Sequence, residues 1–254
     1  MTTTKRNILK RVLAGIPPGS PVTSADLARL GASPNLATYY VRAGWLHRIA
    51  HGVFMRPADT LLLQPALRLL EQRITGLHIG GKSALERHGI QHYVLQRPTL
   101  WLYGWDTAKL PTWFQTSFPS TYVRKRLFDE HPASMLHVHR QHGNDSEVLV
   151  SSPERAFLEL ISEMGTGRMP SDTLMLVWAL DLTDGTYTFR SKVLSELFKK
   201  CTSVTTIRIC LLLGRGLKMP WVKKLNPASL PAGSEKSWGL GHATAQMAKK
   251  SFMA

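Results

Sequence analysis

Along the first 56 residues, apolar and polar positions follow a helical period that turn residues interrupt. Glycine follows each of three helical stretches, and a serine or threonine stands before the second and the third, where it can cap a helix. Alternation at every second residue then indicates two strands joined by a turn. The pattern predicts helices over Lys5–Ala14, Ala25–Leu30 and Ser33–Ala43, and strands over Trp45–Ile49 and Val53–Arg56.

The third predicted helix has an apolar face and a polar face. Leu36, Tyr40 and Ala43 share one side and are expected to pack inward. A helix that lies in the major groove of DNA needs hydrogen-bonding side chains, because asparagine recognises adenine and arginine recognises guanine or phosphate. The opposite side carries such residues at i, i+3, i+4 and i+7: Asn35, Thr38, Tyr39 and Arg42.

Basic residues lie on both sides of this helix in the sequence. Those of the hairpin are placed to reach phosphate or the adjacent minor groove: Arg48, His51 and Arg56. Those of the first helix suit the DNA backbone: Lys5, Arg6, Lys10 and Arg11. Two helices, a turn, a third helix and a hairpin are the order of a winged helix-turn-helix, and we predict that residues 1–56 form a DNA-binding domain of that type.

Beyond residue 57, longer helical stretches alternate with short strands. The predicted helices are Leu61–Arg73, Lys82–His88, a helix opened by Ser152–Pro153, Asp172–Leu182, Ser191–Lys200 and Val204–Leu213; the predicted strands are Thr99–Tyr103, Thr121–Arg126, Met135–His139 and Glu147–Val150. Trp105, Trp113 and Phe114 fall in segments expected to be loops. The sequence thus predicts an α+β protein, in which an N-terminal winged helix-turn-helix precedes a larger mixed α/β domain.

The charge of the chain is unevenly distributed. In all, 32 Lys and Arg residues stand against 17 Asp and Glu, which gives a net charge of +15. Residues 1–56 carry +7, residues 57–189 carry −2 and residues 190–254 carry +10. A balance this basic indicates a polyanionic partner, and its concentration at the two ends favours two separate basic surfaces.

The C-terminal basic residues alternate with Trp221 and Trp238. Cations beside aromatic rings suit RNA, through phosphate contacts and stacking, but they equally suit a solvated cationic segment with nonspecific affinity. The residues considered for this surface are Lys199, Lys200, Arg208, Arg215, Lys218, Lys223 and Lys224.

Targeting and redox signals favour the cytoplasm. The longest apolar run, Leu174–Leu180, is far shorter than the roughly 20 residues that a membrane-spanning helix needs. The basic N-terminus has no apolar stretch after it, unlike a signal peptide. Cys201 and Cys210, the two cysteines of the chain, match no zinc motif and are expected to be free thiols in a reducing compartment.

One segment matches the phosphate-binding pattern G-x-x-x-x-G-K-[ST], from Gly76 to Ser83, with Lys82 as its lysine. A phosphate-binding loop requires a buried strand before the glycine-rich turn. Here the preceding stretch is predicted to be a helix, and the alternation of helices and strands that a nucleotide-binding sheet requires is missing. A nucleotide-binding enzyme that uses Lys82 and Ser83 remains the alternative function, in a different class from DNA binding.

Other candidate chemistry is weaker. His137 and His139 would share a face of a strand and could hold a metal with one carboxylate, but surface histidines explain the pattern equally well. Glu159 and Glu163 share a helical face and are expected to face solvent, while Glu154 lies on another face. No nucleophile arrangement is recognisable. We therefore expect no enzyme, no cofactor and no metal.

Three stretches of the chain resemble the AbiEi-type antitoxins of bacterial type IV toxin–antitoxin systems. They are GWLHRIAHGVFMRP in the hairpin, the pair HIGGKSALERHGI and SSPERAFLELI in the middle, and CTSVTTIRICLLLGRGLKMPWVKKLNPASLPAGSEKS near the end. Together they place roughly residues 1–240 in the order of that family, and the middle pair makes the GGKS loop a structural turn and helix.

The resemblance implies two activities on one chain. Residues 1–56 would bind inverted repeats in operator DNA and repress the operon, and residues 57–240 would form an antitoxin domain. That domain would counteract a nucleotidyltransferase-like toxin, without a stable complex, through a second basic surface; residues 241–254 are expected to be a flexible tail. A solitary regulator of the same architecture without a toxin partner is the alternative within this class.

Overall fold

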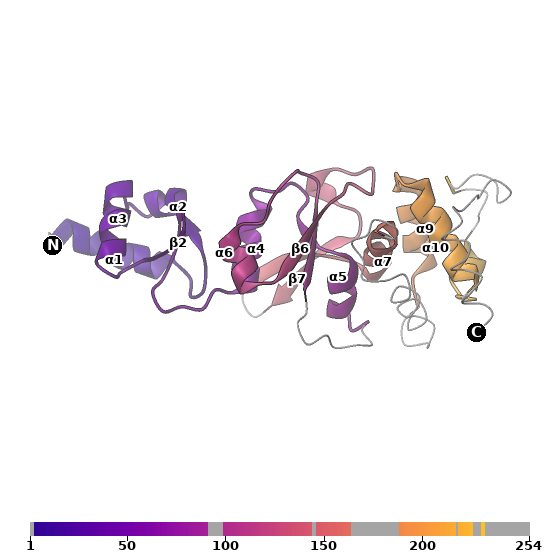
Figure 1. Ribbon diagram of the computed structural model, residues 1–254, viewed down its shortest axis with the longest axis horizontal. Coiled ribbons are helices and arrows are strands. Elements are labelled where there is room, and N and C mark those ends of the chain that lie inside the picture. Colours follow the sequence, from indigo (N-terminus) through magenta and orange to yellow (C-terminus); the bar gives the residue numbers. More distant parts are fainter. Residues whose placement is uncertain are drawn as a thin grey trace. The chain divides into compact units, whose positions relative to one another are not determined.

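The computed structural model of the chain (Figure 1) describes residues 3–90, 99–143, 146–163, 188–216, 218–225 and 230–231. Its contacts define two compact units, one built mainly on residues 1–74 and the other mainly on residues 75–254. Segments 108–119 and 142–148 belong to the first unit. None of the described helices is long and apolar enough to cross a membrane. The helix predicted over 172–182 and the predicted tail over 241–254 lie outside the described residues.

The N-terminal part of the first unit has the predicted order of helices and strands. Its elements are α1 (Thr3–Gly15), β1 (Val22–Thr23), α2 (Ser24–Arg29), α3 (Pro34–Arg42), β2 (His47–Ala50) and β3 (Val53–Met55). The strands form an antiparallel sheet in the order β1-β3-β2, and β2 and β3 are the wing. The sequence pattern did not indicate β1, since a strand of two residues contains no period.

The predicted caps explain where α2 and α3 begin. Thr23 Oγ1 accepts a hydrogen bond from the backbone N–H of Asp26, and the Asp26 carboxylate accepts one from the backbone N–H of Thr23 at 2.7 Å. This reciprocal capping box satisfies two backbone groups that the first turn leaves without partners. Ser33 caps α3 with a single bond, because its hydroxyl oxygen accepts from the backbone N–H of Leu36, and Pro34 takes the first helical position.

A core of its own holds this domain together. The buried residues are Leu9, Val12, Ile16, Val22, Leu27, Ala32, Ala37, Tyr40, Leu46 and Phe54. In α3 the inward face is formed by Ala37 and Tyr40, with Leu36 half-buried, whereas Ala43 is exposed. The expectation that Ala43 packs inward was wrong, because the helix ends at Arg42 and the chain turns away at Gly44, where φ is +74°.

The remaining elements follow the predicted alternation with two additions. The helices are α4 (Leu63–Glu71), α5 (Gly81–Arg87), α6 (Thr112–Ser117), α7 (Pro153–Ser162), α9 (Ser191–Lys200) and α10 (Val204–Gly216), with short 3-10 turns at Pro132–Ser134 and Val222–Lys224. The strands are β4 (His78–Ile79), β5 (Leu100–Gly104), β6 (Ser120–Arg124), β7 (Val138–Gly143) and β8 (Ser146–Ser151).

The additions are α6 and β4. Trp113 and Phe114, expected in a loop, belong to α6, and Phe114 is fully buried there. Strand β4 occupies the centre of a five-stranded sheet in the order β6-β5-β4-β8-β7, where it pairs antiparallel with β5 and parallel with β8. The glycine-rich segment therefore contains a buried strand, contrary to its prediction as a turn after a helix.

Helix α7 is the central helix of the second unit. It packs against α5, α9 and α10, while α5 also packs against β5, so that α7 lies between α5 and the α9–α10 pair (Figure 1). Every residue from Pro153 to Ile161 is buried. A helix that is buried on all sides must place its polar residues in the interior, where each of them requires a partner.

We expect Thr23→Ala to lower the free energy of unfolding of the N-terminal domain by about 1 kcal/mol, because it removes the cap of α2. Thermal unfolding followed by circular dichroism measures the change. Thr23→Ser keeps the hydroxyl and is the matched control, expected to lie within about 0.5 kcal/mol of the wild type. Equal losses in both variants would show that the cap does not stabilise α2.

Candidate functional site

The polar face predicted for α3 lies at the surface. All four of its residues are exposed, and Tyr39 has 46% of its area accessible: Asn35, Thr38, Tyr39 and Arg42. The Thr38 hydroxyl donates to the carbonyl of Pro34 within the same helix, at 3.0 Å, so it keeps only its capacity as an acceptor. The face thus presents an amide, a phenol and a guanidinium in one row.

The wing places two of its predicted residues in contact with each other. Arg48 Nη2 donates to His51 Nδ1 at 2.9 Å, and Arg48 Nε donates to the Ala50 carbonyl at 3.3 Å. Both side chains are exposed, and Arg56, one residue after β3, is half-buried. Two hydrogen bonds therefore hold the Arg48 side chain near the turn of the wing.

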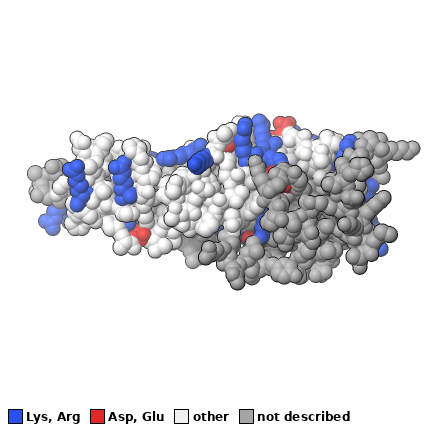
Figure 2. Space-filling model, in the orientation of Figure 1, with Lys and Arg blue, Asp and Glu red and all other residues white. Residues whose placement is uncertain are grey.

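Helix α1 contributes further exposed cations. Arg6, Lys10 and Arg11 are exposed; Lys5 belongs to α1, but its side chain lies outside the described part of the chain. Figure 2 shows basic side chains in separate groups on the visible face, not in one continuous band.

The C-terminal basic residues stand at the two ends of α10. Lys199 and Lys200 end α9, before α10 begins, while Lys218, Lys223 and Lys224 follow α10. These five are exposed, and Arg208 and Arg215, in α10 itself, are half-buried. At about 1.5 Å of rise per residue, α10 separates the two groups by about 20 Å. The predicted surface is therefore two groups of lysines.

Trp221 does not take the role expected of an aromatic ring beside these cations. Its side chain is 2% exposed, and its Nε1 donates to Met219 Sδ at 3.1 Å. A Cβ on Gly214 would lie 2.5 Å from the indole ring, so α10 approaches the ring as closely as a glycine allows. Trp221 belongs to the core and is not available for stacking on a base.

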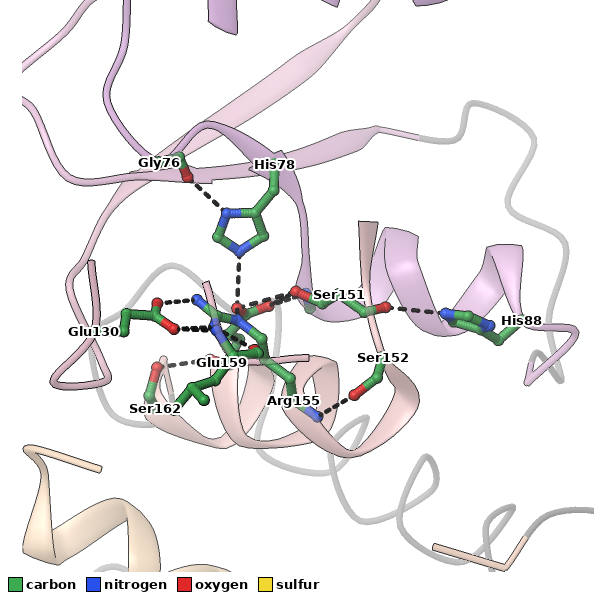
Figure 3. Close-up of polar contacts among 11 residues, drawn as sticks. Gly76, His78, His88, Glu130, Ser151, Ser152, Arg155, Glu159 and Ser162 are labelled. Atoms are coloured by element: carbon green, nitrogen blue, oxygen red, sulfur yellow. Dashed lines mark hydrogen bonds and ion pairs between the residues drawn. The ribbon is translucent and has the colours of Figure 1, made fainter. Parts of the chain in front are cut away.

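A cluster of buried polar residues, the buried polar centre, surrounds the middle of α7 (Figure 3). Glu159 accepts hydrogen bonds from His78 Nε2 at 2.8 Å, from Arg155 Nε at 2.7 Å and from the backbone N–H of Gly81 at 3.1 Å. Ser151 Oγ donates to the same carboxylate at 2.9 Å. One carboxylate thereby joins β4, β8, α5 and α7.

Arg155 connects this carboxylate to a second one. Its two Nη atoms donate to the two oxygens of Glu130, each at 2.8 Å, and Nη1 also donates to the Leu136 carbonyl at 2.7 Å. The guanidinium lies over the ring of Phe128, 4.7 Å from its centroid. The side chains of Arg155 and Glu130 are each 2% exposed. Bidentate pairing of this kind satisfies both charges in an interior that water does not reach.

His78 has a polar partner at each of its two ring nitrogens. Nδ1 lies 2.7 Å from the carbonyl of Gly76, and Nε2 lies 2.8 Å from the Glu159 carboxylate. Both ring nitrogens of this buried side chain therefore have a partner, one in the backbone before β4 and one in α7.

Electrostatics keep Glu159 ionised. Burial by itself would raise the pKa of this carboxyl, but the positive charges and hydrogen bonds of His78 and Arg155 lower the pKa from 4.5 to about 2. Glu154, at the start of α7, is similar: burial raises its pKa, and hydrogen bonds from Arg190 lower it below its ordinary value. Two of the hydrogen bonds to Glu154 come from Arg190 Nε and Nη2, each at 2.9 Å.

The backbone N–H at the start of α5 donates to a carboxylate of the chain itself, that of Glu159. Strand β4 delivers Gly80 and Gly81 to the start of α5, and the Gly81 N–H points at Glu159. A Cβ on Gly80 would collide with the Glu159 carboxylate, and a Cβ on Gly81 would lie 2.7 Å from the Tyr103 hydroxyl. Both glycines are required for internal packing, and Lys82 pairs with Glu86 at 3.6 Å.

Sequence reasoning missed this centre. Glu159 and Glu163 were expected to face solvent; that was wrong, because their side chains are 2% and 1% exposed. Glu163 accepts from Lys125 Nζ at 2.7 Å. The i, i+4 spacing of Arg155 and Glu159 was the available signal, but the same spacing is common on solvated helix faces.

The histidines considered for a metal have other partners. His137 Nε2 lies 3.0 Å from Glu196 Oε2, and the ring centroids of His137 and His139 are 6.4 Å apart. Among the described residues, no group of three His, Cys, Asp or Glu side chains is placed to hold a metal ion.

Comparison with known proteins gives two family matches that adjoin in the sequence. Residues 5–96 match the model described as transcriptional regulator, AbiEi antitoxin N-terminal domain. Residues 97–248 match the model described as transcriptional regulator, AbiEi antitoxin, type IV TA system. No curated protein matches the chain in sequence.

A solved structure has a similar fold. The crystal structure of the RV2827C protein from Mycobacterium tuberculosis superposes with a TM-score of 0.55 at 14% sequence identity, over 89% of this chain and 83% of that one. At this identity the likeness concerns the fold alone.

We expect Glu159→Gln to lower the free energy of unfolding at neutral pH by about 3 to 5 kcal/mol, because it leaves buried cations without their counter-ion. Urea unfolding measures the change. Glu196→Gln is the matched control: this carboxylate also pairs with a histidine, but it is 48% exposed, and its loss should change the free energy by at most about 1 kcal/mol. Equal effects would contradict a stabilising centre.

The stabilisation that Glu159 provides should also depend on pH. The pKa of Glu159 is about 2 in the folded chain and 4.5 ordinarily, so its ionisation stabilises the fold fully above pH 4.5 and this contribution is lost as the pH falls toward 2. The difference in unfolding free energy between wild type and Glu159→Gln should therefore shrink between about pH 5 and about pH 2.5. A constant difference would contradict an ionised Glu159.

Proposed function

This chain belongs to the family of AbiEi antitoxin transcriptional regulators of type IV toxin–antitoxin systems, and from that premise we propose that residues 1–56 bind inverted repeats in operator DNA and repress the chain's own operon. The observation that carries the proposal is the exposed row of polar side chains on α3, in a domain whose other side is a closed apolar core. A recognition helix requires this division, with one face in the core and one in the major groove.

The proposed contacts follow from the chemistry of each side chain. Asn35 suits adenine, and Arg42 suits guanine or phosphate, with Thr38 and Tyr39 between them. The arginine held at the wing tip by His51 suits phosphate or the minor groove, as does Arg56. The basic residues of α1 suit contacts with the phosphates of the DNA backbone: Lys5, Arg6, Lys10 and Arg11.

We expect Arg42→Ala to weaken operator binding by about 1 to 3 kcal/mol if its guanidinium contacts a base. A gel-shift titration at fixed salt measures this, with the promoter of the operon as probe. Arg73→Ala removes an equally exposed arginine outside the winged helix and is the matched control. Unchanged operator affinity in Arg42→Ala would refute the assignment of α3 as the recognition helix.

We further propose that residues 57–240 counteract a nucleotidyltransferase-like toxin in the cytoplasm, without forming a stable complex, and that they act by binding and not by catalysis. Five exposed lysines support a charged surface for this role: Lys199, Lys200, Lys218, Lys223 and Lys224. Arg208 and Arg215 are the half-buried members of the same set. RNA is a second partner that we propose for these cations, because lysine and arginine contact phosphates.

We expect alanine at all five exposed lysines to abolish rescue from a co-expressed toxin while operator binding stays intact. Rescue is measured as growth on induction of the toxin, and operator binding by gel shift. Alanine at Lys109 and Arg73, which are exposed elsewhere, is the control and should keep full rescue. Full rescue by the five-lysine variant would refute the second basic surface. Separately, a genome in which no toxin gene adjoins the gene of this chain would favour the solitary regulator.

A further inference from the structure

Two segments that are distant in the sequence adjoin in the second unit, and each carries two exposed cations. Arg124 ends β6 and Arg126 follows it by two residues, while Lys199 and Lys200 lie at the end of α9. Several contacts join the segment after β6 to the segment after α9. Among them, the Asp129 N–H donates to the Lys200 carbonyl at 2.7 Å, Thr202 Oγ1 donates to the Arg126 carbonyl at 3.3 Å, and Phe128 forms an antiparallel β-bridge with Cys201.

Trp105 holds both arginines in place. The Arg126 guanidinium lies over the indole ring, 4.8 Å from its centroid, and its Nη2 donates to the Glu130 carbonyl at 2.8 Å. Arg124 Nε donates to the Trp105 carbonyl at 3.3 Å. The ring itself is fixed by Gly76, because a Cβ there would lie 2.8 Å from it. The tryptophan is therefore a support for the arginines and not itself a surface for a ligand.

The neighbouring carboxylates do not cancel this charge. Lys125, between the two arginines, is paired with the buried Glu163. Asp106 lies near Arg124, and its pKa is lowered first by hydrogen bonds from Thr75 and then by the arginine charge. Asp129 is exposed beside Lys200. Four exposed cations thus stand against two carboxylates, and the surface is positive.

We propose that Arg124, Arg126, Lys199 and Lys200 bind an unpaired nucleic-acid strand. An arginine fixed on an aromatic ring keeps N–H donors for phosphate and a planar face for a base, and it loses little entropy on binding. Only an unpaired base can stack on such a face, because the bases of a duplex cover one another. The lysines extend the charge along the backbone of the strand.

This inference rests on the proposal that RNA is a partner of the C-terminal cations, and it changes where the strand lies. It adds two arginines from the middle of the chain, which the charge pattern of the sequence did not single out. It also leaves out Lys218, Lys223 and Lys224, at the other end of α10.

The test is fluorescence anisotropy of the full chain with labelled oligo-uridylate and oligo-deoxythymidylate of about 12 nucleotides, a length that one protein surface covers. We expect both probes to bind, and Arg124→Ala with Arg126→Ala to raise the dissociation constant about tenfold or more. Lys199→Ala with Lys200→Ala should raise it several-fold without affecting the fold, since both side chains are exposed. Each pair should lower the slope of log affinity against log salt by about 1.4, or 0.7 per cation.

Arg126→Lys separates the planar face from the charge. It should keep the salt slope of the wild type and still raise the dissociation constant, because an ammonium group does not stack as a guanidinium does. An affinity equal to that of the wild type would contradict the stacking role and overturn the preference for an unpaired strand. Preference for the uridylate probe would identify RNA as the ligand. Equal binding of the two probes would identify the ligand as an unpaired strand of either RNA or DNA.

Matched variants locate the binding. Alanine at Lys218, Lys223 and Lys224 should weaken oligonucleotide binding less than the arginine pair does, and Arg42→Ala should affect only operator DNA. Loss of binding in either of these variants alone, with the arginine pair unaffected, would overturn the inference while the RNA proposal stands. Absence of binding by the wild-type chain would overturn both. A further outcome is that the double variant Arg124→Ala with Arg126→Ala loses toxin rescue and still binds the oligonucleotides as the wild type does. That result would indicate an acidic protein surface as the partner and would also overturn the inference.

Discussion

The second unit depends on the burial of charge on α7, between the neighbouring helices and the five-stranded sheet. Helix α7 is surrounded by α5, α9 and α10, and it carries Glu154, Arg155 and Glu159 on its buried faces. A buried charge without a partner would destabilise the fold by several kcal/mol, so each of these side chains dictates the position of whatever pairs with it. Glu159 positions β4, β8 and the first turn of α5, and Arg155 positions the segment from Glu130 to Leu136. Glu154 does the same for the start of α9 through Arg190.

This arrangement also explains why a motif that suggests nucleotide binding is structural here. The glycines of the GGKS segment allow a backbone N–H and a strand to approach a carboxylate closely, and the carboxylate belongs to the chain itself. The anion-binding capacity of a helix N-terminus is thus used to join α5 to α7. The chemistry left at the surface is cationic, and it occurs in several small groups: the recognition face and wing of the N-terminal domain, the arginines supported by Trp105, and the lysines at the two ends of α10.

Local signals in the sequence were enough for the three helices and the hairpin of the N-terminal domain. Capping residues, a proline at the first helical position and glycines at helix ends act within a few residues of where they stand, so Thr23, Ser33 and Gly44 located the helices. The polar row on α3 followed from helical periodicity alone. Elements without such signals were missed: β1 and β4 have two residues each, too few for a period, and the aromatic residues of α6 resemble those of a loop.

The sequence by itself determined the class of the fold, the winged helix, the family and the concentration of positive charge at both ends, because all of these depend on residues close together in the chain. The tertiary structure alone decided which polar residues are buried and which cations meet. Glu159 and Glu163 have the pattern of a solvated helix face, and only the packing of distant strands and helices around α7 removes them from water. In the same way, Trp221 became part of the core, and Arg126 came to lie beside Thr202, 76 positions later in the chain, because long-range packing and hydrogen bonding leave no mark in local periodicity.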